Sequence, residues 1–307
     1  MIKKFLQVTF FGLLFWYLFS EIDIEKLFIA IQGYSLIGLM ASVFLIFISY
    51  LLLALRWYYM TNKRCKMLPS YEATVIAGFL NTLLPAKAGE VSKVFYLKKY
   101  YNYTVNNSLS LLFIERFFDI IILSLFLAII NVYFAENKQI EIALFILTSV
   151  ILLFLITLKT KMLINIMKYI PIRIVNIFGK KIIKTINNQL RGKILIKTTL
   201  ATIALWISYF LLYLVFFGFT VNFDLNLYQI FIFFIVSTVA LSIPFTPNGA
   251  GTLQAAIVFA GNVFDIIKED ALAASIIIYL IMILVDFVLF MQVIVKKDID
   301  FNELFKK

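Results

Sequence analysis

The stretch that decides the fold is ALAASIIIYLIMILVDFVLFMQVIV, residues 271–295, in which Asp286 is the single charged residue. A helix needs roughly 20 mostly apolar residues to cross the hydrocarbon core of a membrane. The length and composition of this run therefore predict a transmembrane helix. A carboxylate in the middle of such a helix requires a partner or a proton.

Seven further apolar runs of comparable character accompany it along the chain. They predict an all-α, polytopic transmembrane helix bundle with about six to eight spans, organised as a single transmembrane domain over residues 1–307 with a possible inverted repeat. The expected segments are Phe5 to Ser20, Leu36 to Leu55, Leu109 to Phe134, Ile142 to Leu158, Thr198 to Phe217, Leu227 to Ile243 and Gly249 to Phe264.

The composition excludes several classes of function. The 307 residues are 63% hydrophobic and 15% charged, whereas soluble domains are about half apolar and about a quarter charged. The chain has no His, which excludes His-based nucleophiles and His-ligated metals. Cys65 is the single cysteine and is interpreted as inert. No phosphate-binding Gly-x4-Gly-Lys-Ser/Thr string occurs. We expect no metal or other cofactor. Enzymatic activity stays open, but the sequence favours a protein that is not an enzyme.

The distribution of positive charge predicts the orientation in the membrane. With a cytoplasmic N-terminus, the inside segments are 1–4, 56–72, 85–108, 159–197 and 296–307, and they hold all of the 28 Lys and Arg except Lys26, Lys138, Lys268 and Arg116. Cytoplasmic loops retain positive residues. We therefore expect a multi-pass protein of the cytoplasmic membrane with both termini inside, and no nucleic-acid partner.

The longest connection, residues 159–197, combines lysines with apolar residues at helical spacing, among them Leu163, Met167 and Ile170. This pattern is typical of helices that lie in the membrane interface, with a basic face toward anionic head groups. We predict a cytoplasmic, basic amphipathic segment, which either tethers the chain to the membrane or recognises a lipid head group.

Three charged residues lie inside a predicted span, in the string Phe113-Ile114-Glu115-Arg116-Phe117-Phe118-Asp119. An uncompensated charge near the middle of a bilayer costs about 2.5 to 3.5 kcal/mol on insertion scales. Arg116 and Asp119 are three residues apart and can pair on a helix. The cluster is either a structural ion-pair network or a polar wall that contacts a charged substrate.

Two breaks interrupt helices at membrane depth, GFLNTLLPAKAGE at residues 78–90 and SIPFTPNGAGTLQ at residues 242–254. Proline removes a helical N–H and glycine permits tight turns. Backbone groups freed in this way cannot face lipid. Broken half-helices in both halves of a chain indicate a transporter site. We predict two re-entrant helix pairs that are inverted counterparts and meet near the bilayer centre; kinked spanning helices are the alternative.

At these residues the chain resembles a known family. It is similar to the membrane domain of bacterial lysylphosphatidylglycerol synthases (multiple peptide resistance factor) and to related stand-alone membrane proteins. The resemblance rests on Asn81-x-x-Leu84-Pro85-x-x-x-Gly89-Glu90, Lys93, Glu115-Arg116-x-x-Asp119 and Pro247-x-Gly249-x-Gly251-x-x-Gln254. It implies a domain that flips aminoacylated phospholipid between leaflets. A soluble synthase domain is not expected here, because the chain ends soon after its last span.

The sequence departs from the family pattern at three positions. Lys87 and Lys93 stand where the family often has Arg, and Gln254 stands where it usually has Glu. The change at 254 removes a negative charge, which weighs against a lysyl head group in particular.

The predicted function is movement of an anionic or aminoacylated phospholipid, or of another lipid-linked substrate such as a glycan carrier, across the cytoplasmic membrane. Lysine and arginine bind phosphate, so Lys87, Lys93 and Arg116 are its expected contacts, and Glu90, Glu115, Asp119 and Asp286 balance them or carry protons. The full predicted substrate-binding set is Asn81, Pro85, Lys87, Gly89, Glu90, Lys93, Glu115, Arg116, Asp119, Pro247, Gly249, Gly251, Gln254 and Asp286.

Two other classes of function stay open. The first is a membrane-embedded transferase of lipid modification, with Glu90 or Glu115 as general base. The second is a non-catalytic scaffold for a separately encoded synthase or glycosyltransferase. The partners expected in all cases are membrane lipids.

Overall fold

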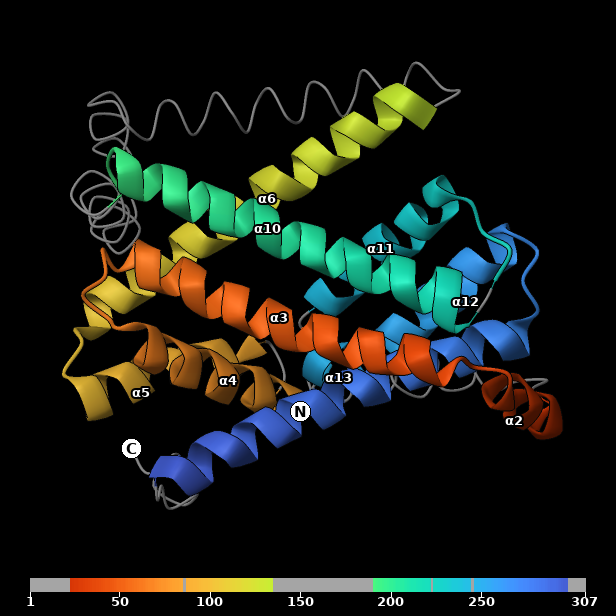
Figure 1. Cartoon of the computed structure of the whole chain (residues 1–307), viewed down its shortest axis with the longest axis horizontal. Coiled ribbons are helices and arrows are strands. Elements are labelled where there is room, and N and C mark those ends of the chain that lie inside the picture. The colour runs from red at the N-terminus through yellow and green to blue at the C-terminus, as the bar shows by residue number, and fades with distance from the viewer. Residues whose placement is uncertain (1–22, 85–86, 135–189, 222, 244–245, 298–307) are drawn as a thin grey trace, which may run out of the picture. The chain divides into compact units, whose positions relative to one another are not determined.

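The computed structural model describes residues 23–84, 87–134, 190–221, 223–243 and 246–297, which form helices joined by turns (Figure 1). The all-α prediction is confirmed. Several sequence predictions lie outside the described residues: the spans Phe5 to Ser20 and Ile142 to Leu158, Pro85, and the interfacial segment up to residue 189.

Three of the described helices are long and apolar enough to cross a membrane. They are α3 (Leu36–Met60), α10 (Lys193–Val215) together with the π-helical turn Phe216–Thr220, and α13 (Lys268–Lys297). Helix α6 (Val105–Phe134) has 30 residues, and it carries the charged cluster. The chain is a helical membrane protein.

The outward face of α3 explains why the chain needs lipid. Large apolar side chains are exposed at helical spacing along it, while Ser42, Ser49 and Tyr50 are buried on the other side. Soluble proteins rarely expose a contiguous apolar surface of this kind. The exposed row consists of Leu36, Ile37, Met40, Phe44, Phe47 and Leu51.

The chain divides into two compact units, and the boundaries fall within helices. Unit 1 comprises Met1–Tyr50, Val75–Lys93 and Ser208–Lys307, and unit 2 comprises Leu51–Thr74 and Val94–Ile207. Helices α3, α4 (Met67–Leu83), α5 (Gly89–Tyr101) and α10 each contribute to both.

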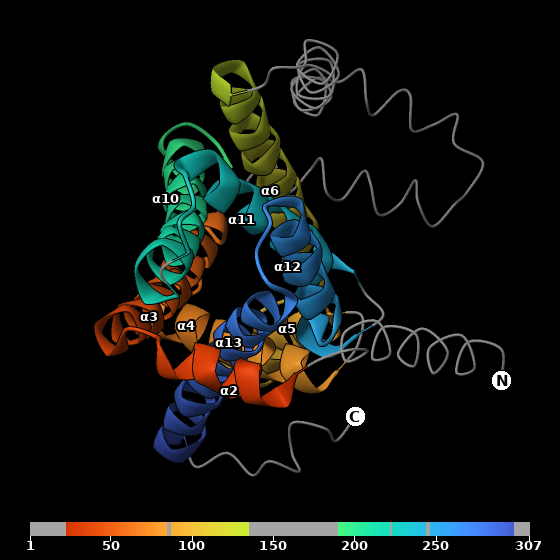
Figure 2. The same cartoon turned by 90° about the vertical axis from the view of Figure 1, so that its right-hand side faces the viewer.

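Unit 1 is built around α13. Helix α11 (Leu227–Ser242) packs against α12 (Thr252–Val263), α12 packs against α13, and α13 packs against α2 (Ile24–Gln32) (Figure 2). Asn226 begins α11 with a capping box, in which its side chain accepts from the Gln229 N–H at 2.9 Å. Such reciprocal capping stabilises a helix start.

Unit 2 contains a buried carboxylate that joins the start of α4 to the end of α5. Glu72 is 2% exposed, and its Oε2 accepts hydrogen bonds from the hydroxyls of Tyr96 at 3.0 Å and Tyr101 at 2.5 Å. In unit 1, the first residue of α5 lies against the last turns of α4. Both contacts indicate that α5 runs back along α4 as a helical hairpin.

The structure corrects one boundary that matters for the site. From sequence, the second span was predicted to end at Leu55, with Arg56 in the cytoplasmic loop that follows it. Helix α3 instead continues to Met60, and the turn that follows it contains Asn62 and Lys63, which have positive φ of 55° and 61°. Arg56 is therefore a helical residue, and it is 1% exposed. No proline or glycine lies between Leu55 and Met60 to stop the helix earlier.

Candidate functional site

The first break joins α4 to α5. A Cβ added to Gly89 would lie 2.4 Å from the Ala77 carbonyl oxygen and 2.5 Å from the Asn81 backbone nitrogen. Real Cβ atoms do not approach backbone so closely, so only glycine lets α5 begin against α4. Just before it, Lys87 has a φ of 51°, a conformation that is uncommon for residues other than glycine.

Polar groups of the predicted set lie at this break. The Oδ1 atom of Asn81 is buried and has no hydrogen-bond partner among the described residues. Lys93 is 4% exposed, one turn into α5. Lys87 and Glu90 are partly buried. A basic residue and a helix N-terminus in one place favour an anion.

The second break joins α11 to α12 through the 3-10 turn Pro247–Gly249. Asn248, Gly249 and Gly251 have positive φ of 45°, 75° and 78°. The Thr252 hydroxyl donates to the carbonyl oxygens of Ala240 at 3.1 Å and Gly249 at 3.0 Å. Thr252 thus ties the start of α12 to the end of α11, and the break forms a second helical hairpin.

Gln254 has a defined local role at this hairpin. The backbone N–H of Gly251 donates to its Oε1 at 2.7 Å, which satisfies a donor at the start of α12. Gln254 is 9% exposed. The predicted substrate contact at this position is therefore also a helix cap.

Helix α13 contacts both hairpins within unit 1. The Tyr279 hydroxyl donates to the Pro247 carbonyl oxygen at 3.3 Å. Further along α13, the ring of Phe290 stacks on Phe79 of α4 with centroids 4.1 Å apart. Between them, Asp286 accepts a hydrogen bond of 2.6 Å from the Tyr50 hydroxyl.

Tyr50 in turn lies against the first hairpin. A Cβ added to Gly78 of α4 would be 1.9 Å from the Tyr50 hydroxyl oxygen. Gly78 therefore makes the space in which that hydroxyl reaches Asp286. Tyr50 is 7% exposed and Asp286 is 6% exposed. A buried Tyr–Asp pair thus lies between α3, α4 and α13.

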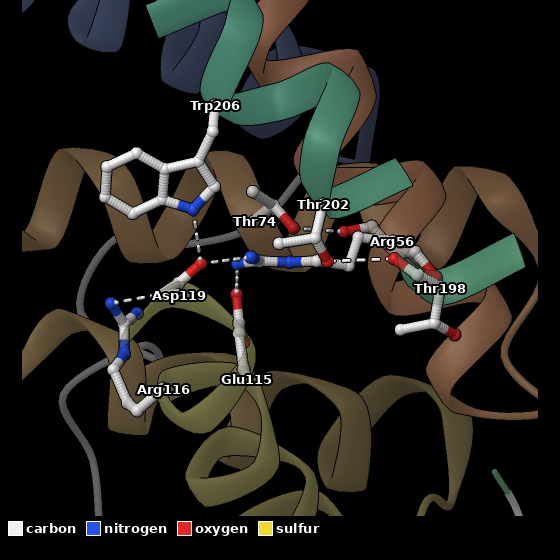
Figure 3. Close-up of polar contacts among 9 residues, drawn as sticks. Arg56, Thr74, Glu115, Arg116, Asp119, Thr198, Thr202 and Trp206 are labelled. Carbon is white, nitrogen blue, oxygen red and sulfur yellow. Dashed lines mark hydrogen bonds and ion pairs between the residues drawn. The ribbon is translucent and has the colours of Figure 1, made fainter. Parts of the chain in front are cut away.

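The charged residues of α6 form a separate cluster, in unit 2, around Arg56 (Figure 3). The guanidinium of Arg56 donates from Nη2 to Glu115 and from Nη1 to Asp119, the latter at 2.5 Å. Asp119 also accepts from the Trp206 indole N–H at 3.2 Å and pairs with Arg116 at 3.3 Å. Thr74, Thr198 and Thr202 are buried in the same region.

This Arg56 cluster, made of Arg56, Glu115, Arg116, Asp119 and Trp206, carries two positive and two negative charges. Its members come from α3, α6 and α10. The buried pair Arg56–Glu115 is 1% and 2% exposed, whereas 43% of the Arg116 side chain is exposed. The arrangement joins three helices, and it leaves Arg116 as its accessible cation.

Sequence reasoning missed Arg56, Tyr50 and Trp206 as members of these sites. Of these three, Arg56 could have been recognised from the sequence, because it directly follows a run that is apolar from Leu36 to Leu55. A charge placed there can belong to the helix as well as to the loop. Tyr50 and Trp206 carried no such signal, since aromatic residues are common in membrane helices.

The predicted substrate-binding set divides between the units. Unit 2 holds Glu115, Arg116 and Asp119. Unit 1 holds Asn81, Lys87, Gly89, Glu90, Lys93, Pro247, Gly249, Gly251, Gln254 and Asp286. Within the described ranges, no group of three or more Cys, Asp and Glu residues is placed to hold a metal ion.

Apolar outward faces, buried charges and two broken helical hairpins define a polytopic helical membrane protein with polar groups in its interior. Comparison with known proteins places it more closely. A family model described as the lysylphosphatidylglycerol synthase TM region matches residues 4–289. The chain belongs to this family, as its motifs predicted.

A curated relative supports the assignment. The chain is 30% identical over 211 residues to a UPF0104 membrane protein of Methanocaldococcus jannaschii, and the match covers 66% of this chain and 87% of the relative. No solved structure matches the chain.

Proposed function

We propose that the protein moves an anionic phospholipid, aminoacylated or not, or another lipid-linked anion across the cytoplasmic membrane. The observation that carries the proposal is the contact of both broken hairpins with α13 in unit 1. Broken half-helices around one helix are a frequent design of transporter binding sites.

The lengths of the hairpin helices support this reading. Helices α4, α5, α11 and α12 have 17, 13, 16 and 12 residues, whereas a full span needs roughly 20. Paired short helices that turn back within the bilayer leave polar backbone at the turns. Such backbone is stable only where it lines a polar path or is buried in protein.

The charges at the first hairpin favour an anionic head group. Lys87 and Lys93 flank the N-terminus of α5, where the helix dipole is positive. Lys93 is almost fully buried, so its charge acts in a medium that screens it weakly. A lipid phosphate that reaches this turn gains both interactions, while its acyl chains remain beside the exposed apolar faces.

The test uses the purified protein in liposomes with fluorescent phosphatidylglycerol and a membrane-impermeant quencher. The protein should move labelled lipid to the quenched leaflet. The pair Lys87→Ala with Lys93→Ala should slow movement about tenfold or more, as expected for losing at least 1.4 kcal/mol of head-group binding. The matched control is Lys98→Ala with Lys99→Ala, which removes the same charge from exposed positions of α5.

Three outcomes would count against the proposal. Equal rates of lipid movement for the two double variants would mean that Lys87 and Lys93 contribute only to the orientation of the chain in the membrane. A new lipid species in the extracted membranes would indicate a transferase. Absence of lipid movement until a separate synthase chain is added would indicate a scaffold.

A further inference from the structure

Asp286 is a buried carboxylate at membrane depth. It lies in the middle of α13, and exposed apolar residues surround it along that helix, including Leu280, Leu284, Phe287, Val288 and Met291. A lone carboxylate in this position is costly when ionised, and residues of this kind in membrane helices commonly serve ion or proton pathways.

The polar surroundings of Asp286 are simple. Its carboxylate accepts from the Tyr50 hydroxyl at 2.6 Å, and among the described residues no Lys or Arg forms an ion pair with it. Tyr279 lies two turns earlier on α13, and its hydroxyl donates to the Pro247 carbonyl oxygen rather than to Asp286. A single neutral donor stabilises the carboxylate but does not cancel its charge.

In unit 1, the described helices around α13 carry charged residues on α2 and at the first hairpin. Helix α2 carries Glu25 and Lys26 after Asp23, whose N–H donates to Glu269 near the start of α13. Helices α11 and α12 contain no charged residue. The first hairpin contributes Lys87, Glu90 and Lys93 to unit 1, and no ion pair joins them to Asp286 in the described structure. The α3 part of unit 1 contributes Tyr50.

We propose that Asp286 is a proton-binding site and that its protonation is coupled to the passage of the anionic substrate. The carboxylate takes up one proton from water and becomes a neutral acid, while the Tyr50 hydroxyl continues to donate to the other oxygen. The coupling, but not the proton binding, rests on the proposed function.

The position of Asp286 explains how coupling works. Helix α13 contacts the second hairpin through Tyr279 and the first hairpin through Phe290. Tyr50, which donates to Asp286, also lies against Gly78 of the first hairpin. An ionised Asp286 repels an anionic head group between these hairpins, and a neutral Asp286 does not. One proton and one singly charged phosphodiester then cross together without net charge.

Proton binding is tested first, without any lipid movement, by infrared difference spectra of the reconstituted protein between acidic and alkaline pH. Wild type should show the carbonyl band of a protonated carboxylic acid that Asp286→Asn lacks. Tyr50→Phe should retain the band at a shifted frequency, because one hydrogen bond to the carboxyl is lost. The matched control, Asp265→Asn, removes an exposed carboxylate at a φ of 56° that Asn tolerates.

Coupling is tested next in liposomes with an imposed pH gradient and the membrane potential clamped. For wild type and Asp265→Asn, a gradient of one unit should shift the leaflet ratio of labelled phosphatidylglycerol by up to about tenfold, since one unit equals 1.36 kcal/mol per proton. For Asp286→Asn, the leaflet ratio should not change with the pH gradient.

The outcomes separate the two proposals. A spectrum of Asp286→Asn that keeps every carboxyl band of wild type would overturn proton binding at Asp286. If wild type shows the carboxylic acid band but its lipid movement does not depend on the pH gradient, proton coupling would be wrong and lipid transport would still hold. A wild-type band with no lipid movement at all would leave the proton site standing and overturn the proposed function.

Discussion

Arg56 of α3 and Glu115 of α6 form an ion pair in which both side chains are almost fully buried. They are 59 residues apart in sequence. The second Nη atom of Arg56 contacts Asp119, so one guanidinium binds two carboxylates of the same helix. Arginine suits this geometry because its donors form a rigid planar fork.

Arg56→Ala should destabilise the protein by about 3 to 5 kcal/mol, because Glu115 would keep its charge without a buried partner. Arg116→Ala should cost about 0 to 1 kcal/mol, as is typical of exposed pairs, since 43% of the Arg116 side chain is exposed. Thermal unfolding in detergent, followed by tryptophan fluorescence, measures both. Equal loss in the two variants would contradict the central place of Arg56.

From sequence, the predicted pair within this cluster was Arg116 with Asp119, and the structure adds Arg56 as a partner of both carboxylates. A double variant gives a sharper test of the cluster. Replacing Arg56 by Met and Glu115 by Leu removes both charges at once, and it should be less damaging than Arg56→Ala alone.

Gly78→Ala should weaken unit 1, because the added Cβ would meet the Tyr50 hydroxyl at 1.9 Å. The expected cost is about 1 to 3 kcal/mol, the usual range for overpacking. Tyr50→Phe in the same chain should recover part of this loss, since it removes the atom that clashes. The measurement is the unfolding midpoint in detergent for the single and double variants.

Gly218→Ala is the control for this pair. An added Cβ there would find Ile230 Cδ1 at 3.6 Å, an ordinary contact, so stability should hardly change. If Gly78→Ala also proves neutral, Tyr50 does not fill the space above Gly78 and the described contact is wrong.

Gln254→Leu should destabilise the start of α12 by about 0.5 to 2 kcal/mol, as for other lost helix caps, because the Gly251 N–H would lose its acceptor. Gln254→Glu should retain the cap or strengthen it, since a negative charge is favourable at a helix N-terminus. Hydrogen exchange of the α12 amides reports the difference. Equal protection in Leu and Glu variants would rule out the capping role.

The orientation predicted from loop charge is tested with single cysteines in a Cys65→Ser background. Asp224→Cys should react with an impermeant thiol reagent added outside, and Arg191→Cys should react only after the membrane is opened. Both positions are exposed. Labelling of Arg191→Cys from outside intact cells would reverse the predicted topology.

The native chain should label poorly in the same experiment even when the membrane is opened. Cys65 lies in the turn between α3 and α4 and is 4% exposed. Burial raises the pKa of its thiol, although the hydrogen bond from Ser70 lowers it. Little reactive thiolate is therefore present at neutral pH, and labelling should increase as the pH is raised. Fast labelling of wild type at neutral pH would contradict this environment.

The sequence by itself determined the class of protein and the places where its helices break. Runs such as 271–295 are too long and too apolar for any other use, and Gly89, Pro247 and Gly251 mark turns because their backbone preferences are local. The motifs that predicted the family contain the same residues. Hairpins at both breaks agree with that local signal.

Only the tertiary structure decided which polar groups meet. Arg56 was assigned to a loop because its sequence neighbours end an apolar run, yet its partners Glu115 and Asp119 lie far along the chain. Tyr50 finds Asp286 across 236 residues. Long-range pairs depend on how helices pack, and helix packing is set by the shapes of many side chains at once. A charged residue in an apolar helix indicates that a partner is required, but the packing of the helices determines which residue that partner is.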